Sequence, residues 1–298
     1  MIRTKGEKVF GVFNIIFMVI FALVFIIPIL FLFKTAFDMS PQTISLNLFP
    51  ADPSLIFVKA VFRDNSIYKP FLNSIIITIL GTSGAMAVNS MGAYTLSRRD
   101  LPGVSSMVYF MIVIPMFVSG GMVPSYLIMK TLGWTNTLTV LIVPGMVSGF
   151  NMIIIRNYYW TVPKSLLEAA RIDGAGEFTT FVRIILPLSK PVLAAIALFT
   201  GVGYWQTFMS AVIYVSDSSK QPFSVKLREL IMTQQEYTSQ FDELLREMNK
   251  QSSYAGASLN QDGIASVIIL FSMVPILVAY PWLQKYFAAG MLRGSIKG

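Results

Sequence analysis

The chain has 298 residues, of which 54% are hydrophobic and only 13% are charged, and its net charge is +8. This composition excludes a soluble domain with an ordinary polar surface and indicates a membrane protein. The sequence contains neither cysteine nor histidine, which excludes disulfides, thiol nucleophiles, imidazole bases and the usual zinc ligands. We therefore expect no catalytic residue and no metal site in this chain.

Six runs of the sequence are apolar enough to cross a bilayer as helices, which takes about 20 residues each. They cover residues 9–33, 71–96, 104–129, 138–155, 191–215 and 264–283. The first run is too long for the apolar part of a signal peptide, so we expect it to be retained. The predicted fold is an all-α membrane protein with six transmembrane helices, in a single domain over residues 1–298, because no repeat divides the chain.

The loops between these runs differ in length and charge. Residues 34–70 and 216–263 form long loops on one side, and residues 156–190 form a long loop on the other. With the N-terminus inside, the cytoplasmic segments carry the whole net charge of +8, and the outer loops hold equal numbers of acidic and basic residues. The positive-inside rule therefore predicts cytoplasmic N- and C-termini. The net positive charge of the cytoplasmic segments indicates this topology and an affinity for anionic lipids, and we expect no nucleic acid partner.

The second outer loop contains a polar segment, Thr233–Gln251, with apolar residues at helical spacing. The pattern predicts an external amphipathic helix. Such a helix fits a lid packed on the membrane domain, and the alternative is a surface that meets an external partner; one helix can serve both purposes.

The six runs contain no Asp, Glu, Lys or Arg. Since proton-coupled transporters use such residues inside the membrane, the sequence disfavours this class, although sodium coupling through backbone carbonyls stays open. The second to fifth runs are instead interrupted by glycine and proline. These residues permit close helix packing and kinks, so we expect bent helices that surround a path.

Neutral polar and aromatic side chains lie near the middle of the runs. They are Asn73, Asn89, Asn151, Tyr204, Trp205 and Gln206. Amides and hydroxyls can bind sugar hydroxyls, and an aromatic face can stack on a sugar ring. All of them except Asn73 are predicted to line a substrate path, and the alternative for each is a hydrogen bond between helices.

The loop 156–190 contains a patterned segment that begins at Glu168, EAARIDGAGEFTTFVRIILPLSKP. Ser165 stands three residues before Glu168, which is the spacing of a capping box and predicts a helix start. Asp173 and Gly174 predict that this helix ends in a turn. The first helix has a small apolar face, formed by Leu166, Leu167, Ala169 and Ala170. This face suits a groove on another protein, and the alternative is a helix that lies only at the membrane interface.

The residues after the turn predict a second short helix that runs to Pro187. One face of it is apolar and consists of Phe178, Phe181, Val182 and Ile185. We therefore expect two short helices, separated by the turn, at the cytoplasmic membrane surface.

This segment closely resembles the signature loop of the permeases of ATP-binding cassette (ABC) importers, in which EAA precedes a DGA-type turn and an I-x-LP ending. The matching residues are Glu168 to Ala170, Asp173 to Ala175, Ile184, Leu186, Pro187 and the trailing Pro191. The stretches NSIIIT, AYTLSRRDLPG and KYFAAGMLRGSIKG are similar to the carbohydrate branch, in particular to the second permease of maltose-type importers. The stretch MFVSGGMVPSYLIMKTLGWTNT resembles the subgroup for complex oligosaccharides, such as alginate and pectin fragments.

The resemblance implies a type I ABC importer permease fold, with a cytoplasmic coupling helix and a long external loop before the last helix. It implies that the following residues contact an ATPase: Ser165, Glu168, Ala169, Ala170, Asp173, Gly174 and Ala175. The implied partners are a second homologous permease, two ATP-binding subunits and an external solute-binding protein that delivers an oligosaccharide at the bacterial cytoplasmic membrane. Transport would proceed by alternating access. ATP and Mg would be bound by the ATPase, since this chain lacks the phosphate-binding motif G-x-x-x-x-G-K-[ST].

Other functions fit the sequence less well. A membrane enzyme needs an acid and base pair at the membrane face, and the acids of the loops stand in no recognisable constellation. A passive channel or an ion-coupled secondary transporter would leave the patterned loop unexplained. Within the importer class, a non-sugar solute such as a peptide is the alternative cargo.

Overall fold

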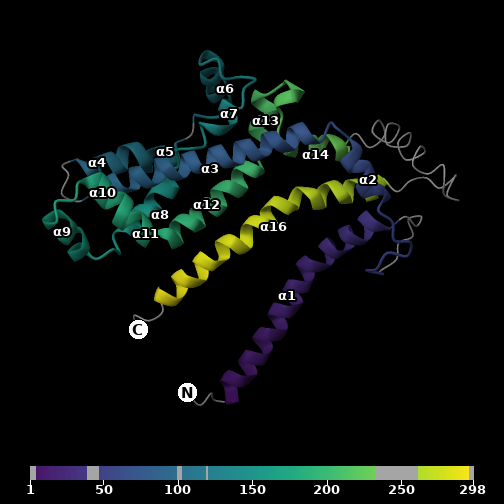
Figure 1. The fold of residues 1–298 in the computed structure, drawn as a ribbon, viewed down its shortest axis with the longest axis horizontal. Helices are drawn as coiled ribbons and strands as arrows, with labels where there is room; N and C mark the ends of the chain where they lie inside the picture. Colours follow the sequence, from purple (N-terminus) through teal and green to yellow (C-terminus); the bar gives the residue numbers. More distant parts are fainter. Residues whose placement is uncertain (1–4, 39–46, 99–102, 119, 233–260, 295–298) are drawn as a thin grey trace. The chain divides into compact units, whose positions relative to one another are not determined.

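The structure, a computed structural model, describes residues 5–38, 47–98, 103–118, 120–232 and 261–294 (Figure 1). Within these ranges the chain is mostly helical, and one isolated bridge pairs Asp38 with Pro53. The predicted all-α class is therefore confirmed. The helix predicted over Thr233–Gln251 lies outside the described residues.

By its contacts the chain forms two compact units, which are described one at a time. They are Met1–Ile67 with Leu227–Met273, and Tyr68–Lys226 with Val274–Gly298. Two helices, α14 (Phe223–Met232) and α16 (Gln261–Gly294), contribute residues to both units. The single membrane domain over residues 1–298 stays a prediction.

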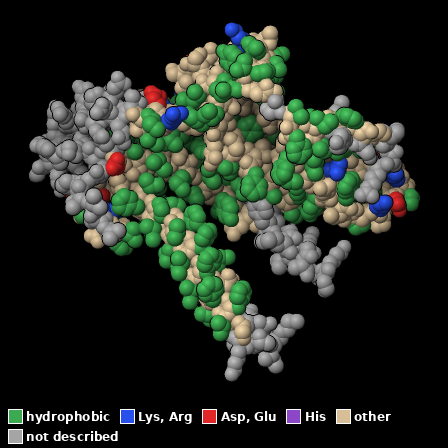
Figure 2. Space-filling model, turned by 180° about the vertical axis from the view of Figure 1, so that it is seen from behind, with side chains coloured by type: hydrophobic (Ala, Val, Ile, Leu, Met, Phe, Trp, Pro, Cys, Tyr) green, Lys and Arg blue, Asp and Glu red, His purple; other side chains and the backbone are tan. Residues whose placement is uncertain are grey.

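The first unit begins with α1 (Lys5–Phe37), a helix that is hydrophobic on all sides. Most of its large side chains are exposed, and Figure 2 shows them along the length of the helix. A helix without a polar face is stable only where water is excluded. We therefore expect lipid or another membrane chain to cover α1.

The second helix of this unit, α2 (Ile56–Arg63), packs against the first half of α16. The Phe62 ring meets the Phe271 ring edge to face, with 5.2 Å between their centres. Gly263 lies against Phe57, where a Cβ atom would come within 2.6 Å of the ring. This position requires glycine because the buried Phe57 ring leaves no room for a side chain.

The central helix of the second unit is α3 (Tyr68–Ser97). It packs along α12 (Lys190–Trp205) and α8 (Gly149–Tyr159), and the three helices lie side by side in Figure 1. A Cβ atom at Gly81 would lie 2.5 Å from the Tyr204 ring. The prediction that small residues permit close helix packing is confirmed at this crossing.

The described residues contain three helices long and apolar enough to cross a membrane, Val9–Phe37, Tyr68–Ser97 and Asp262–Pro281. A fourth span results if Glu177–Leu188 and Lys190–Trp205, which are bent by 80°, count as one. Three of the six predicted runs therefore agree with continuous helices. The runs 104–129, 138–155 and 191–215 are divided into shorter helices in the structure, and their crossing of the membrane stays a prediction.

The run 104–129 is divided into several short helices. They are α4 (Val104–Val108), the π-helical segment η1 (Tyr109–Val113), α5 (Ile114–Phe117) and α6 (Met122–Thr131). The backbone of Gly121 just before α6 has a φ of +82°, which a helix cannot accommodate. Glycine tolerates this value, so one helix ends before Gly121 and the next begins directly after it.

The runs 138–155 and 191–215 are also interrupted. In the first, α7 (Thr139–Ile142) and α8 are separated by residues 143–148, which include Pro144 and Gly145. Proline has no N–H to donate and glycine disfavours helix, so the helix stops there. In the second, α12 ends at Trp205 and α13 (Met209–Tyr214) follows after a short gap. The bends expected from glycine and proline are present, as breaks rather than kinks.

The segment between α8 and α12 contains the patterned loop. Its elements are α9 (Lys164–Ile172), α10 (Glu177–Thr180), the π-helical segment η2 (Phe181–Ile185) and α11 (Leu186–Leu188). A 3-10 turn, η3 (Ser218–Lys220), precedes α14. The predicted pair of short helices separated by a turn is therefore confirmed.

Candidate functional site

The start of α9 differs from the predicted capping box. The helix begins at Lys164, and the residue at its N-cap is Pro163, which makes no side-chain cap. The Leu166 N–H instead donates to the Pro163 carbonyl at 3.2 Å. The capping box of Ser165 and Glu168 is therefore wrong: Pro163 fixes an extended backbone just before Lys164, so Ser165 lies inside the helix.

The end of α9 is a Schellman motif. The Ala175 N–H donates to the Ala170 carbonyl at 2.9 Å, and the Gly174 N–H donates to the Arg171 carbonyl at 3.1 Å. Gly174 has a φ of +76°, which requires a residue without a Cβ atom. The turn predicted at Asp173 and Gly174 is confirmed, and it fixes the direction in which the chain leaves α9.

The two faces of α9 have different surroundings. Ala170 is buried, and Leu167 packs on a cluster that includes Tyr94 and Phe181. The side chains of Ser165, Leu166, Glu168 and Ala169 are exposed. The apolar face predicted from the sequence is thus divided, because its inner members serve packing within the chain.

The exposed face of α9 combines one acidic group with apolar surface. Within the part of the chain that the structure describes, the Glu168 carboxylate makes no hydrogen bond or ion pair. Ile172, at the end of the helix, is 86% exposed. An acidic side chain beside exposed apolar groups is a surface suited to a protein partner with a basic, partly apolar cleft.

The second predicted apolar face is only half correct. Phe181 and Ile185 are buried, but Phe178 is 74% exposed and Val182 is also exposed. These residues pass from an α-helix into a π-helical segment, so the 3.6-residue period used for the prediction does not continue. The helix also does not stop at Pro187, since α11 runs one residue further to Leu188.

A site residue that sequence reasoning missed is Glu177, the first residue of α10. Its Oε2 accepts a hydrogen bond from the Tyr94 hydroxyl at 2.6 Å, and its Oε1 forms an ion pair with Arg98. Arg171 of α9 lies 3.5 Å from the same carboxylate oxygen. The only sequence signal for this contact is that opposite charges occur on two predicted cytoplasmic segments.

Among the predicted path residues, Asn89 is completely buried at the break between α7 and α8. Its amide Nδ2 donates to the Ala85 carbonyl at 2.6 Å and the Met146 carbonyl at 2.8 Å. Its Oδ1 accepts from the Ser148 N–H at 2.9 Å. In this conformation the side chain therefore satisfies backbone groups that the break leaves without helical partners.

Tyr204 contacts the same break from α12. Its hydroxyl donates to the Ile142 carbonyl at 2.8 Å, and its ring lies against Gly81 and Gly145. The structure thus brings Asn89 and Tyr204 together around one interruption of the helices. The alternative of an interhelical hydrogen bond describes both residues in this conformation.

The other three predicted path residues differ in exposure. Trp205 is buried and packs edge to face against Phe71, with 5.6 Å between the ring centres. Asn151 is half-buried and its Nδ2 donates to the Thr200 hydroxyl at 3.3 Å. Gln206 is exposed just after the end of α12. A role of these residues in a substrate path stays a prediction.

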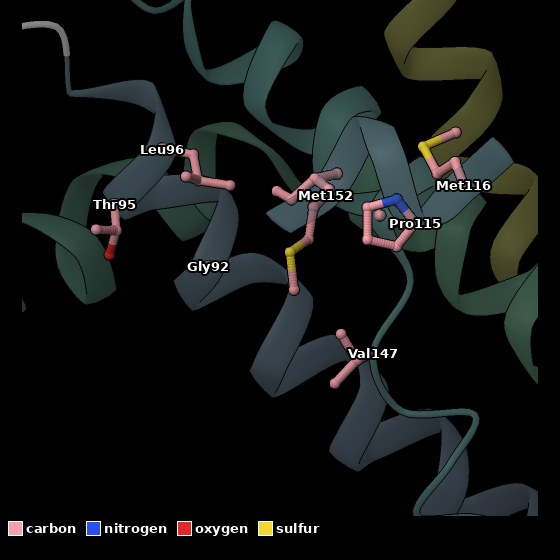
Figure 3. A pocket seen from close by; sticks show the side chains of 9 residues that line it. Gly92, Thr95, Leu96, Pro115, Met116, Val147 and Met152 are labelled. Carbon is pink, nitrogen blue, oxygen red and sulfur yellow. The ribbon is translucent and has the colours of Figure 1, made fainter. Parts of the chain in front are cut away.

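A pocket of about 510 Å³ lies between the second half of α3, the segment around α5 and the start of α8 (Figure 3). Its lining consists of Gly92, Thr95, Leu96, Ile112, Pro115, Met116, Val147, Gly149 and Met152. None of the predicted path residues contributes to it. With one hydroxyl among apolar side chains, this pocket has few groups that could bind a sugar.

The family model described as the binding-protein-dependent transport system inner membrane component matches residues 102–293. The chain belongs to this family. The resemblance drawn from the signature loop is therefore confirmed, and this family member is a non-catalytic transmembrane permease of an ABC importer. Membership of this family implies ATPase and binding-protein partners and a second permease.

Two relatives match almost the whole of this permease. The polygalacturonan/rhamnogalacturonan transport system permease protein YtcP of Bacillus subtilis (strain 168) is 36% identical over 284 residues, which is 95% of this chain and 96% of YtcP. The melibiose/raffinose/stachyose import permease protein MelC of the same organism is 28% identical over 305 residues and covers 99% of each chain.

A solved structure agrees with the fold of this permease. It is the crystal structure of a bacterial ABC transporter involved in the import of the acidic polysaccharide alginate. The match has a TM-score of 0.85 and 26% sequence identity, and it covers 96% of this chain and 99% of that one. The type I importer permease fold expected from the signature loop is thereby supported.

Proposed function

We propose that this permease forms one half of the membrane pore of an ABC importer for an oligosaccharide or a polysaccharide fragment. The observation that carries the proposal is similarity over nearly the full length to permeases named for polygalacturonan and rhamnogalacturonan and for melibiose, raffinose and stachyose. An external binding protein delivers the sugar, and the site of transport is the bacterial cytoplasmic membrane, with both termini of the chain in the cytoplasm.

The exposed face of α9 is the proposed contact with an ATPase subunit. Glu168 is free to pair with a basic residue of a partner, and Ser165 and Ala169 offer small neighbours that permit close approach. Asp173, Gly174 and Ala175 form the turn that orients this face, and Ala170 anchors it to the rest of the chain. The exposed side chains are assigned to the contact with the ATPase, and the buried one to packing within the chain.

The proposed path uses the predicted polar residues in two ways. Gln206 is exposed and Asn151 is half-buried, so these amides are available to sugar hydroxyls. Asn89, Tyr204 and Trp205 are buried, and we assign them the task of holding the broken helices in shape. These three residues then shape the wall of the path, and in this conformation they do not contact the sugar themselves.

The proposed mechanism is alternating access driven by a partner. ATP and Mg are bound and ATP is hydrolysed by the two ATPase subunits, whose closure moves α9 of each permease. The permease pair then rocks between outward-facing and inward-facing states as rigid groups of helices. The residues of this chain dock, transmit movement and form the path.

The test is a pull-down of the tagged, full-length chain from its native membrane in mild detergent, followed by mass spectrometry. We expect a second permease of the same family and an ATPase with a phosphate-binding motif to be recovered with it. Recovery of the chain alone, under conditions in which a known membrane complex from the same cells stays intact, would contradict the proposal.

A further inference from the structure

Two residues that flank α9 contact the same turn of α3. Before α9, the indole Nε1 of Trp160 donates to the Ser97 carbonyl at 2.9 Å. After α9, Glu177 accepts from the Tyr94 hydroxyl at 2.6 Å and pairs with Arg98. The helix α9 is therefore the projecting part of a loop whose two ends are fastened to the last turn of one helix.

The contact after α9 is partly shielded from water. The Arg98 side chain is only 13% exposed, while that of Glu177 is 57% exposed. The Arg98 guanidinium lies over the Tyr94 ring at 5.3 Å, and this ring packs against Phe181 at 5.1 Å between centres. Such an ion pair is screened less by solvent than one between two exposed side chains.

Each fastening point is supported by a neighbouring basic residue. Arg171, in the last turn of α9, lies 3.5 Å from the Glu177 carboxylate and so connects this group with α9 itself. On the other side, the Arg156 guanidinium lies over the Trp160 ring at 4.4 Å. Both contacts restrict the rotamers of the side chains that hold α3.

The loop that contains α9 is attached to the end of α3 at two points, one before α9 and one after it, and this differs mechanically from attachment at a single point. A loop held at one point can pivot, so a push on α9 would turn the loop and leave α3 in place. Two attachments to one turn resist this rotation and pass the displacement to α3. Because α3 packs along both α8 and α12, a movement of its last turn reaches the central packing of the second unit.

We propose that Trp160 and Glu177 form an α3 clamp, through which movement of α9 is transmitted to α3. The clamp is defined by these two residues and by Tyr94, Ser97 and Arg98, which they contact. Its members are positioning residues: they touch neither sugar nor ATP. This inference rests on the proposed function, since it assigns a role to α9 that only a docking loop has.

The test uses the complete transporter, with its partner permease, ATPase subunits and binding protein, in proteoliposomes. In Glu177→Gln, we expect the ATPase to co-purify at the wild-type level, while sugar uptake per ATP hydrolysed falls by at least about fivefold, the lower end of energetic coupling between sites. Misfolding or poor assembly lowers uptake and hydrolysis together, so the ratio separates lost transmission from lost protein.

Further variants make the test specific. Trp160→Phe keeps an aromatic ring but removes the indole N–H that bonds to Ser97, and it should lower the same ratio. Glu177→Asp and the charge exchange of Arg98→Glu with Glu177→Arg should recover part of it. The matched control is Arg183→Gln, an exposed residue of the same loop whose side chain has no hydrogen bond or ion pair in the described part of the chain.

Two results would overturn the inference and separate it from the proposed function. An unchanged ratio in Glu177→Gln, together with loss of the ATPase in Glu168→Lys, would reject the α3 clamp and keep the docking role of α9. Normal recovery of the ATPase in Glu168→Lys would reject that docking role, and the clamp with it.

Discussion

In Glu168→Lys, recovery of the ATPase with the permease is expected to fall by about tenfold or more, while the permease itself stays folded. The Glu168 side chain is exposed, and no hydrogen bond or ion pair within the described residues depends on it. Reversal of its charge therefore costs the chain little stability. At an interface with a basic partner, the same change replaces an attraction by a repulsion, and loss of such a pair costs several kcal/mol.

The measurement is the molar ratio of ATPase to permease after affinity purification, determined by quantitative mass spectrometry. Arg183→Glu serves as the control, because it also reverses an exposed charge in the same loop, and Arg183 is not one of the residues that match the signature pattern. Ser165→Ala should have little effect on folding, since its hydroxyl does not cap α9. A wild-type ratio in Glu168→Lys would reject the proposed docking of α9 on the ATPase.

The second large effect is expected for Asn89→Leu, which should destabilise the permease by about 2–4 kcal/mol. Leucine has a similar shape but leaves the Met146 carbonyl and the Ser148 N–H without the partner that Asn89 supplies. Both groups belong to the break before α8. The hydrogen bonds that are lost involve buried backbone groups, and water cannot easily replace the Asn89 amide there.

Thermal unfolding of the purified protein in detergent measures this effect as a lower Tm. The matched control is Ser90→Ala in the same turn of α3. The Ser90 hydroxyl donates to the Met86 and Ala87 carbonyls of its own helix. Such bonds back to the same helix contribute little to stability, so removal of the hydroxyl should change the Tm little. An unchanged Tm in Asn89→Leu would mean that the break is held by other contacts.

Local patterns in the sequence predict the continuous helices and the turn after α9. The apolar length of α1 and α3 predicts continuous helices because nothing in their sequences interrupts the hydrogen bonds of the backbone. Similarly, the DGA sequence predicts the turn after α9, since Gly174 supplies the positive φ that a Schellman motif needs.

Other features depend on information that local patterns do not contain. The glycine and proline of these runs predict a bend, but hydropathy does not tell whether Pro144 and Gly145 bend a helix or end it, because the residues around them are apolar in both cases. The ion pair between Arg98 and Glu177 joins residues that are 79 positions apart. Its geometry depends on how α3 and α10 pack, which neither segment determines alone.

For the predicted substrate path, residue type alone does not determine the role of a residue. A polar residue in an apolar run can bind a substrate or can satisfy backbone groups inside the protein, and both uses select the same residue types. Asn89 performs the second task in this structure, which becomes visible only once the break at residues 143–148 is known. Gln206, in contrast, keeps an exposed amide.

The most direct test of the central claim is uptake by proteoliposomes that contain the purified complex with ATP inside and the binding protein outside. With labelled oligogalacturonides and raffinose-type sugars as candidate cargoes, we expect uptake of at least one that requires both ATP and the binding protein. Uptake driven by a sodium gradient without ATP, or ATP-driven uptake of peptides with no uptake of any oligosaccharide, would contradict the account.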